Sequence, residues 1–274
     1  MILDAAYSLT SDYDFGVNIS TVEEMKRKFH TRYGGGNGTV DFLNDEWQRY
    51  RDNGNHIFDS NFLSLVARCP NGAADMVAGK IESGMIRSKL GVTPGRSYIE
   101  GRFRMPAGRG MWPAFWLIPL DLTWPPEIDI FEIVNNGRDT TRNSFHNALN
   151  PESPYWKVNA DGTSALVAWK QSIEPFTKLD QWHSYHPANT DFADGFHKFG
   201  FLWEGNLGSW YVDNVLVLTK LIDWRYPRTG QSSGPAAIIA NLAVGGAWPQ
   251  PPQSIADFPA RFDIDYIRVW ERCA

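Results

Sequence analysis

The sequence lacks any apolar run long enough to cross a membrane. The longest mostly apolar stretch, residues 235–248, is shorter than the roughly 20 residues that a spanning helix needs, and it contains Asn241. The N-terminus shows no basic stretch followed by an apolar run, so we expect no signal peptide in this chain. The sequence therefore predicts no membrane partner.

Basic residues are scarcer than acidic ones. Lys and Arg number 26 against 31 Asp and Glu, which gives a net charge of -5, and no run of Lys or Arg stands out. Proteins that bind nucleic acid present a basic stripe or patch to the phosphates. Nucleic acid is therefore excluded as the main partner.

Cysteine is nearly absent, since the chain has only Cys69 and Cys273. Neither has the spacing of a metal ligand. Cys273 ends the last predicted strand and Cys69 follows another strand. If these two strands are neighbours, a disulfide would tie down the C-terminus, and the sequence leaves this open.

Aromatic residues and short strands are what the chain has in quantity. Its 12 Trp suit either a β core or the C–H faces of sugars.

Residues 25–30 follow capping residues and predict a short helix. From about residue 57, short alternating runs are split by Gly, Pro, Asn and Asp, which predicts an all-β antiparallel sandwich formed by one domain over residues 1–274. Residues 147–195 form the longest irregular stretch. The strands are expected at 62–67, 97–105, 199–203, 210–212, 215–218, 238–244 and 264–270.

The most informative segment is an apolar strand that carries Glu127, Asp129 and Glu132. Strict alternation puts Glu127 and Asp129 on one face but sends Glu132 to the core, where an unpaired carboxylate is costly. One extra residue, a bulge near Ile130 or Phe131, returns Glu132 to the acidic face. The pattern thus predicts three acids on one face, where the two glutamates can supply the pair of carboxyl groups, about 5 Å apart, that a retaining glycosidase needs. The alternatives are a solvated strand face and a cation site.

This segment and its surroundings resemble glycoside hydrolase family 16, which includes laminarinases, lichenases, agarases and κ-carrageenases. The resemblance covers about residues 57–274, and residues 1–56 match weakly. It implies a jelly-roll, concanavalin-like sandwich with an open substrate cleft on the concave sheet. The similar segments are Gly84–Lys89, Gly101–Pro106, Gly110–Trp116, Phe196–Phe199, Trp210–Asp213, Asn241–Gly246 and Asp265–Val269.

The resemblance also implies roles for individual residues. Glu127 would be the nucleophile, Asp129 its electrostatic helper, and Glu132 the general acid/base. Trp112 and Trp124 are candidate sugar platforms, and Trp116 is a platform or a core residue. The remaining implied roles are His146 near the acid/base and a structural calcium ion at Asp265. His197 is expected to be a buried structural residue. Independently of the resemblance, the acidic charge balance disfavours a highly sulfated substrate, and Arg138 and Arg142 are candidates for a local basic subsite.

The expected function is an endo-acting retaining β-glycoside hydrolase that cleaves a β-glucan or a bacterial exopolysaccharide by double displacement. Alternatives are a β-galactanase of the agarase or carrageenase type, a transglycosylase, and a glycan-binding sandwich without catalysis. Residues 147–149, Asn-Ala-Leu, depart from laminarinases and put plain β-1,3-glucan specificity in doubt. No cofactor is required for catalysis. We expect a monomer, and the polysaccharide substrate implies an extracellular or periplasmic site of action.

Overall fold

The computed structural model describes residues 3–273, except for residues 4, 36–37, 41–43, 60, 125, 136–144, 151–155, 159–163, 167–181, 186–189 and 227–228. Only the backbone is described for residues 35, 38–40, 145–150, 156–158, 164–166 and 182–185.

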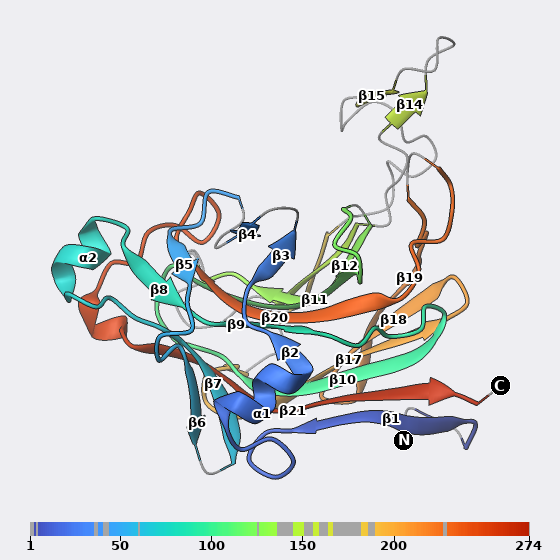
Figure 1. The fold of residues 1–274 in the computed structure, drawn as a ribbon, viewed down its shortest axis with the longest axis horizontal. Helices are drawn as coiled ribbons and strands as arrows, with labels where there is room; N and C mark the ends of the chain where they lie inside the picture. The colour runs from blue at the N-terminus through green and yellow to red at the C-terminus, as the bar shows by residue number, and fades with distance from the viewer. Residues whose placement is uncertain are drawn as a thin grey trace.

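Two large antiparallel sheets lie face to face, which confirms the predicted sandwich (Figure 1). The first sheet has the order β19-β18-β17-β10-β21-β7-β6, and β1 also pairs with β21. Its strands are β1 (Tyr7–Asp14), β6 (His56–Asp59), β7 (Phe62–Ala67), β10 (Arg96–Arg104), β17 (His197–Glu204), β18 (Leu207–Val212), β19 (Val215–Leu221) and β21 (Ala260–Arg272).

The second sheet has the order β16-β13-β12-β11-β20-β9-β2. Its strands are β2 (Phe29–His30), β9 (Met85–Ser88), β11 (Met111–Pro119), β12 (Glu127–Ile133), β13 (Phe145–Asn150), β16 (Trp182–Tyr185) and β20 (Ala236–Val244). The strands predicted from alternation all appear, with shifts of a few residues at their ends.

Smaller elements decorate the sandwich. Helix α1 (Val22–Lys28) begins at a capping box in which Thr21 and Glu24 exchange hydrogen bonds. The predicted short helix is therefore present, but it ends at Lys28, and residues 29–30 form strand β2 instead. The others are the helix α2 (Ala73–Val77), the 3-10 helix η2 (Ile255–Asp257), the hairpin β3 (Tyr33–Gly35) and β4 (Gly38–Val40), and the parallel pair β5 (Gln48–Tyr50) and β8 (Ile81–Ser83). No helix among the described residues is long and apolar enough to span a membrane.

The prediction of irregular structure over residues 147–195 was wrong in part. Strand β13 extends into this stretch, and β14 (Trp156–Val158), β15 (Ser164–Leu166) and β16 lie within it. These strands are very short, except for β13. Alternation cannot reveal strands of three or four residues, because a pattern of period two needs more positions to stand out.

The main core lies between the two sheets and includes side chains from β1 through β21. Strands β11 and β20 are buried along their whole length, because a second cluster covers their other face. In that cluster Tyr33 and Tyr50, from the N-terminal part, pack over Trp116 and Ile239. This double burial explains why β11 and β20 read as continuous apolar runs. That residues 1–274 form one domain stays a prediction.

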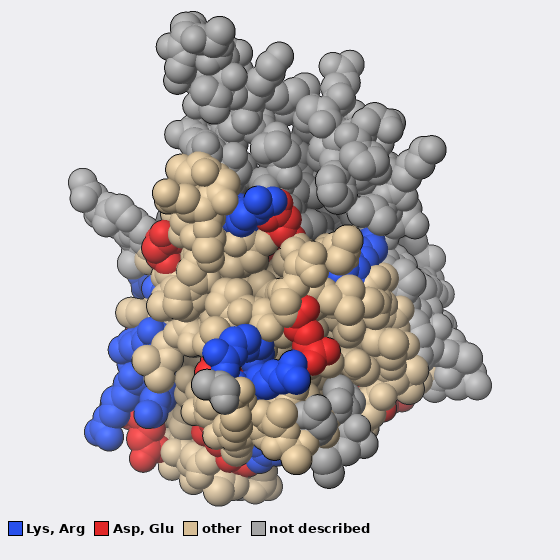
Figure 2. Space-filling model, turned by 90° about the vertical axis from the view of Figure 1, so that its right-hand side faces the viewer, with Lys and Arg blue, Asp and Glu red and all other residues tan. Residues whose placement is uncertain are grey.

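The face of the molecule shown in Figure 2 carries acidic and basic side chains close together rather than in separate patches. Much of the remaining described surface on this face belongs to uncharged residues. No broad basic area appears among the described residues of this face.

A disulfide between the two cysteines is excluded by the register of β21. Ala67 pairs with Ala260 at the start of β21, so Cys69 lies near that end, whereas Cys273 follows the other end. The 13 residues of β21 span roughly 40 Å, and a disulfide requires Cα atoms within about 7 Å. Both cysteines are free thiols.

We therefore expect thiol titration of the protein, denatured without a reducing agent, to find two thiols per chain. The same titration after reduction is the control and should give the same number. A value near zero before reduction and two after it would contradict the register.

Candidate active site

The three acids of β12 reach one face through a bulge at Ile130. Phe131 pairs with Phe115 of β11, but the next pair joins Asp129 to Trp116, so Ile130 is the extra residue. This confirms the predicted bulge. As a result, the three acids line the cleft on one face, and the apolar residues of the strand all join the main core on the other. These apolar residues are Ile128, Ile130, Phe131 and Ile133.

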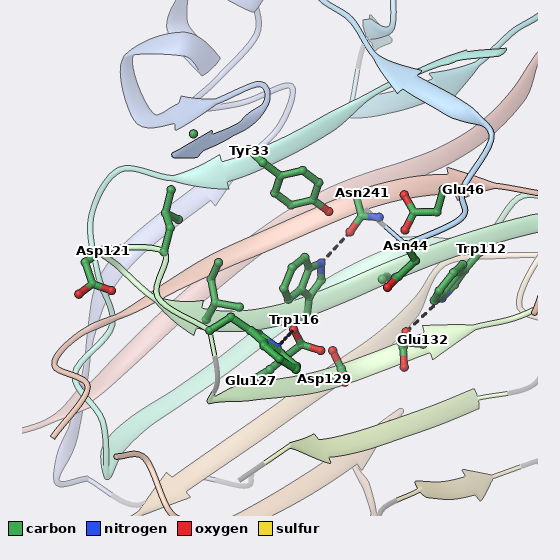
Figure 3. Close-up of a pocket in the computed structure, with 15 residues that line it drawn as sticks. Tyr33, Asn44, Glu46, Trp112, Trp116, Asp121, Glu127, Asp129, Glu132 and Asn241 are labelled. Carbon is green, nitrogen blue, oxygen red and sulfur yellow. Dashed lines mark hydrogen bonds between the residues drawn. The ribbon is translucent and has the colours of Figure 1, made fainter. Parts of the chain in front are cut away.

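A cleft of about 610 Å³ opens over the second sheet, in front of these acids (Figure 3). Glu127, Asp129 and Glu132 stand on one side of it, and Tyr33, Asn241 and Glu46 on the other, with Trp116 between them. The full lining is Tyr33, Gly34, Asn44, Glu46, Trp112, Ala114, Trp116, Ile118, Asp121, Leu122, Trp124, Glu127, Asp129, Glu132 and Asn241.

A tryptophan from the opposite sheet supports the bulge. The indole Nε1 of Trp210, on β18, donates a hydrogen bond of 2.9 Å to the backbone carbonyl of Asp129. A bulge disrupts the ladder locally, so a buried carbonyl beside it needs another donor. Trp210 is fully buried and supplies this donor across the core.

Each glutamate receives an indole hydrogen bond of its own. Trp112 Nε1 donates to Glu132 Oε1 at 3.2 Å, and Trp124 Nε1 donates to Glu127 Oε2 at 3.0 Å (Figure 3). Trp112 is buried and packs edge-on against Trp248, whereas Trp124 is largely exposed. Trp112 and Trp124, which the sequence predicted as sugar platforms, therefore also form hydrogen bonds with the two glutamates.

Burial and mutual repulsion raise the pKa values of all three acids. Burial raises the pKa of Glu127 to about 7, and the Trp124 indole opposes this rise. The pKa of Glu132 rises to about 8 through burial and the charge of Glu127, with Glu46 adding to it and the Trp112 indole opposing it. Burial and both glutamates raise the pKa of Asp129 well above its usual range. The three acids therefore titrate as a coupled group that retains protons near neutral pH.

One oxygen of Glu132 is left without a partner. Its Oε2 atom is buried and makes no hydrogen bond with any described residue. A buried carboxyl oxygen of this kind is costly when charged, which agrees with a protonated Glu132. Because Glu132 lines the cleft, this carboxyl can give its proton to a group bound there.

Trp116 serves as the floor of the cleft and is nearly buried. Its Nε1 donates to Asn241 Oδ1 at 2.7 Å, and the Asn241 amide donates to the Tyr50 hydroxyl at 2.9 Å. The Trp116 ring also contacts Tyr33, with centroids 6.0 Å apart. Trp116 thus combines the two roles that the sequence left open, because it packs in a cluster and lines the cleft.

Several lining residues lay outside the sequence-based predictions. Tyr33, Asn44 and Glu46 come from the part of the chain that matched the family weakly, and Asn241 carried no predicted role. Glu46 is buried, and its carboxylate accepts a hydrogen bond of 2.6 Å from Gln48 Nε2. In the sequence, Gln48 and Tyr50 alternate with charged residues. This alternation was the only local sign that a strand with a buried polar face lies beside Glu46.

The remaining predicted residues lie elsewhere. His146 pairs with Glu132 across β12 and β13, but its side chain falls outside the described residues, as do Arg138 and Arg142. His197 is half-buried on the first sheet, with Nδ1 2.7 Å from Asp213 Oδ2, and it does not line the cleft.

Asp265, where the sequence predicted a structural calcium ion, forms an ion pair. Its carboxylate lies 2.5 Å from Nη1 of Arg102. Among the described residues, no group of three His, Cys, Asp or Glu side chains could hold a metal ion. Calcium also accepts backbone carbonyl and water oxygens, so a calcium ion at Asp265 stays a prediction.

Comparison with known proteins points to one family. The model of glycosyl hydrolases family 16 matches residues 48–268. The chain is 30% identical over 188 residues to the endo-1,3-1,4-beta-glycanase ExsH of Rhizobium meliloti, covering 69% of this chain and 33% of that protein. It is 32% identical over 202 residues to a beta-glucanase of Rhodothermus marinus, covering 67% and 59%.

The structural comparison agrees. The catalytic domain of an endo-1,3-beta-glucanase (laminarinase) from Thermotoga petrophila superposes with a TM-score of 0.69 at 26% identity, over 97% of this chain and 98% of that one. The chain spans about a third of the length of the first curated relatives that it matches.

The hydrogen bond from Trp210 to Asp129 predicts a stability effect. Trp210→Phe should lower the free energy of unfolding by about 1–3 kcal/mol beyond the loss of ring volume, because it leaves a buried carbonyl unsatisfied. Trp203→Phe is the matched control, since Trp203 is equally buried in the same core. Urea unfolding of both variants measures the difference. Equal losses would show that the Trp210 bond contributes nothing.

Proposed function

The chain belongs to glycosyl hydrolase family 16, and we propose that it is an endo-acting retaining hydrolase of a β-linked glucan. The family match covers most of the chain, and the relatives that it resembles are named as a beta-glycanase or as beta-glucanases. Because the curated relatives are longer than this chain, the proposal concerns the reaction that its own cleft can perform.

The observation that carries the proposal is the pair of glutamates in the cleft, each held by its own indole. A retaining mechanism needs one carboxylate as a nucleophile and one carboxylic acid as a proton donor. Glu127 accepts the Trp124 hydrogen bond, which favours its ionised form and suits the nucleophile, whereas Glu132 has a buried oxygen without a partner among the described residues, which favours its protonated form and suits the acid. Their different surroundings separate the two roles.

The reaction follows in two steps. In the first, a Glu127 oxygen forms a bond to the anomeric carbon, the glycosidic bond breaks, and Glu132 gives its proton to the departing oxygen. In the second, Glu132 takes a proton from water, the water oxygen bonds to the anomeric carbon, and Glu127 leaves as a carboxylate. Two inversions give net retention of configuration.

Asp129 lies between the glutamates and is best assigned to support Glu127. Burial and the charges of both glutamates raise its pKa, which favours a neutral Asp129 that adds no second negative charge beside the nucleophile. A protonated carboxyl can also donate a hydrogen bond to the Glu127 carboxylate and orient it. We therefore assign Asp129 a positioning role rather than a bond-forming one.

The cleft also supports internal cleavage of a polymer. In Figure 3, Asp121 lies to one side of Glu127, and Trp112 and Glu46 lie to the other, so sugars have room on both sides of the acids. The floor residue Trp116 and the exposed Trp124 offer apolar surfaces to sugar rings. A polymeric substrate of this kind also implies action outside the cytoplasm.

Azide rescue tests the two roles separately. With Glu132→Ala, an aryl glycoside with a good leaving group should still form the glycosyl enzyme, and azide should release a glycosyl azide of retained configuration. With Glu127→Ala, azide should attack directly and give the inverted product. Proton NMR of each product reads the anomer, and activity on a natural glucan should be lost in both variants.

Glu46→Ala is the matched control, because it removes another buried carboxylate from the same cleft. Azide should give no glycosyl azide with this variant. Products with exchanged configurations would mean that nucleophile and acid are assigned the wrong way round. Failure of azide to rescue either variant would overturn the retaining mechanism.

The pH profile gives a second test. Activity needs an ionised Glu127 and a protonated Glu132, so kcat/KM should rise through a pKa of about 7 and fall above a pKa of about 8. The Trp124 bond lowers the pKa of Glu127, so Trp124→Phe should move the acidic limb up by at most about one unit. Trp112→Phe should move the alkaline limb up for the same reason. The proposal fails if each variant moves the opposite limb.

A further inference from the structure

A second pocket adjoins the cleft at Asp121. It has a volume of about 420 Å³, which is within the range of ligand-binding sites. Asp121 lines both the cleft and this pocket, and Figure 3 places it at the end of the cleft away from Trp112 and Glu46. The full lining of the pocket is Leu120, Asp121, Tyr226, Ser232, Ser233, Gly234 and Pro235.

Two loops form the pocket, and one of them connects the strands β11 and β12. Leu117 of β11 pairs with Ile128, the neighbour of Glu127, and Asp121 follows Leu117 by four residues. Four residues span at most about 14 Å. A glycan that is bound over Glu127 therefore reaches Asp121 within a few sugar units.

The other loop, between β19 and β20, is fixed by the core. The buried Trp224 packs edge-on against Trp203, with ring centroids 5.0 Å apart, and its Nε1 donates a hydrogen bond of 2.8 Å to the Gly234 carbonyl. The backbone N–H of Tyr226 donates to the Gln231 carbonyl at 2.9 Å. Because both walls are held in place by these bonds, a ligand would not have to order them.

An ionised carboxylate stands where the pocket meets the cleft. The Tyr226 hydroxyl donates to Asp121 Oδ2 at 2.7 Å, and the backbone N–H of Thr123 donates to Oδ1 at 3.0 Å. Burial acts to raise the pKa of Asp121, but these hydrogen bonds lower it overall. The Asp121 side chain is exposed, and a carboxylate accepts about four hydrogen bonds, so it can still accept bonds from ligand hydroxyls.

The rest of the lining suits a neutral, hydroxyl-rich ligand. Tyr226 is half-buried and offers an aromatic face, and Ser232 adds an exposed hydroxyl. The buried Ser233 hydroxyl has no partner among the described residues, so the pocket favours a polar ligand over an apolar one. None of the described lining residues is a cation, and Asp121 would repel an anion.

We propose that this pocket is an additional subsite, which binds one neutral sugar unit of the glycan held in the cleft. This rests on the proposed function and extends its substrate to a glycan that places a sugar beyond Asp121. A charged acceptor for neighbouring hydroxyls and an aromatic face for C–H groups match the two sides of a sugar ring. The sugar belongs either to the continuing chain or to a branch, and its chemistry is the same in both cases.

The test measures kcat/KM on linear β-1,3- and mixed β-1,3-1,4-linked glucose oligomers of increasing length, and on a β-1,3-glucan with single β-1,6-linked glucose branches. Wild-type kcat/KM should rise once the chain or a branch reaches the pocket. Ser232→Leu places a larger apolar side chain in the pocket. It should reduce this gain roughly tenfold, mainly through KM, and leave the shortest cleaved oligomer unaffected.

Thr229→Leu is the matched control. Thr229 and Ser232 are exposed residues of the same loop, and each hydroxyl accepts from the backbone N–H two residues later, but Thr229 does not line the pocket. This variant should keep the full gain. Tyr226→Ala removes the aromatic face and should reduce the gain as Ser232→Leu does. Activity on the shortest oligomer shows that each variant is folded.

The outcomes separate the two proposals. A loss confined to long linear oligomers assigns the sugar to the continuing chain, and a loss confined to the branched glucan assigns it to a branch; both support the subsite. A wild type that cleaves none of these glucans would remove the proposed function. Active variants that lose nothing, that lose equally on short and long substrates, or that match Thr229→Leu would overturn only the subsite.

Discussion

Strand β12 is a short strand with two different environments, the apolar core on one face and the cleft on the other. Its apolar residues face the core, and its three acids face the cleft. Simple alternation cannot place Glu127 and Glu132 on the same face, because they are five residues apart. The extra residue at Ile130 resolves this conflict, and Trp210 satisfies the carbonyl beside the bulge from the opposite sheet. This hydrogen bond thus links the bulge that positions Glu132 to the opposite sheet.

The floor and far wall of the cleft depend on the N-terminal part of the chain. Tyr50 binds the Asn241 amide, and Asn241 in turn binds the Trp116 indole. Gln48 both accepts from the backbone of Val244 and donates to Glu46. These bonds fix segments that lie far apart in the sequence. They also bury polar groups that would be costly if any member of the network were lost.

Charge is distributed unevenly along the cleft. Three carboxyl groups lie on β12, where burial raises the pKa of each and favours its protonated form. Removal from water thus keeps protons in the cleft near neutral pH, at the place where the proposed reaction needs a proton donor.

The sequence by itself determined the sandwich, most strand positions, the bulge and the acid triad, because each follows from local alternation or from the high cost of burying an unpaired carboxylate. It could not determine that Cys69 and Cys273 lie at opposite ends of β21, since strand direction and register arise from long-range pairing. It also missed Glu46 and Tyr33. Their places in the cleft come from which segments become neighbours, and a local pattern carries no information about partners that are distant in the sequence.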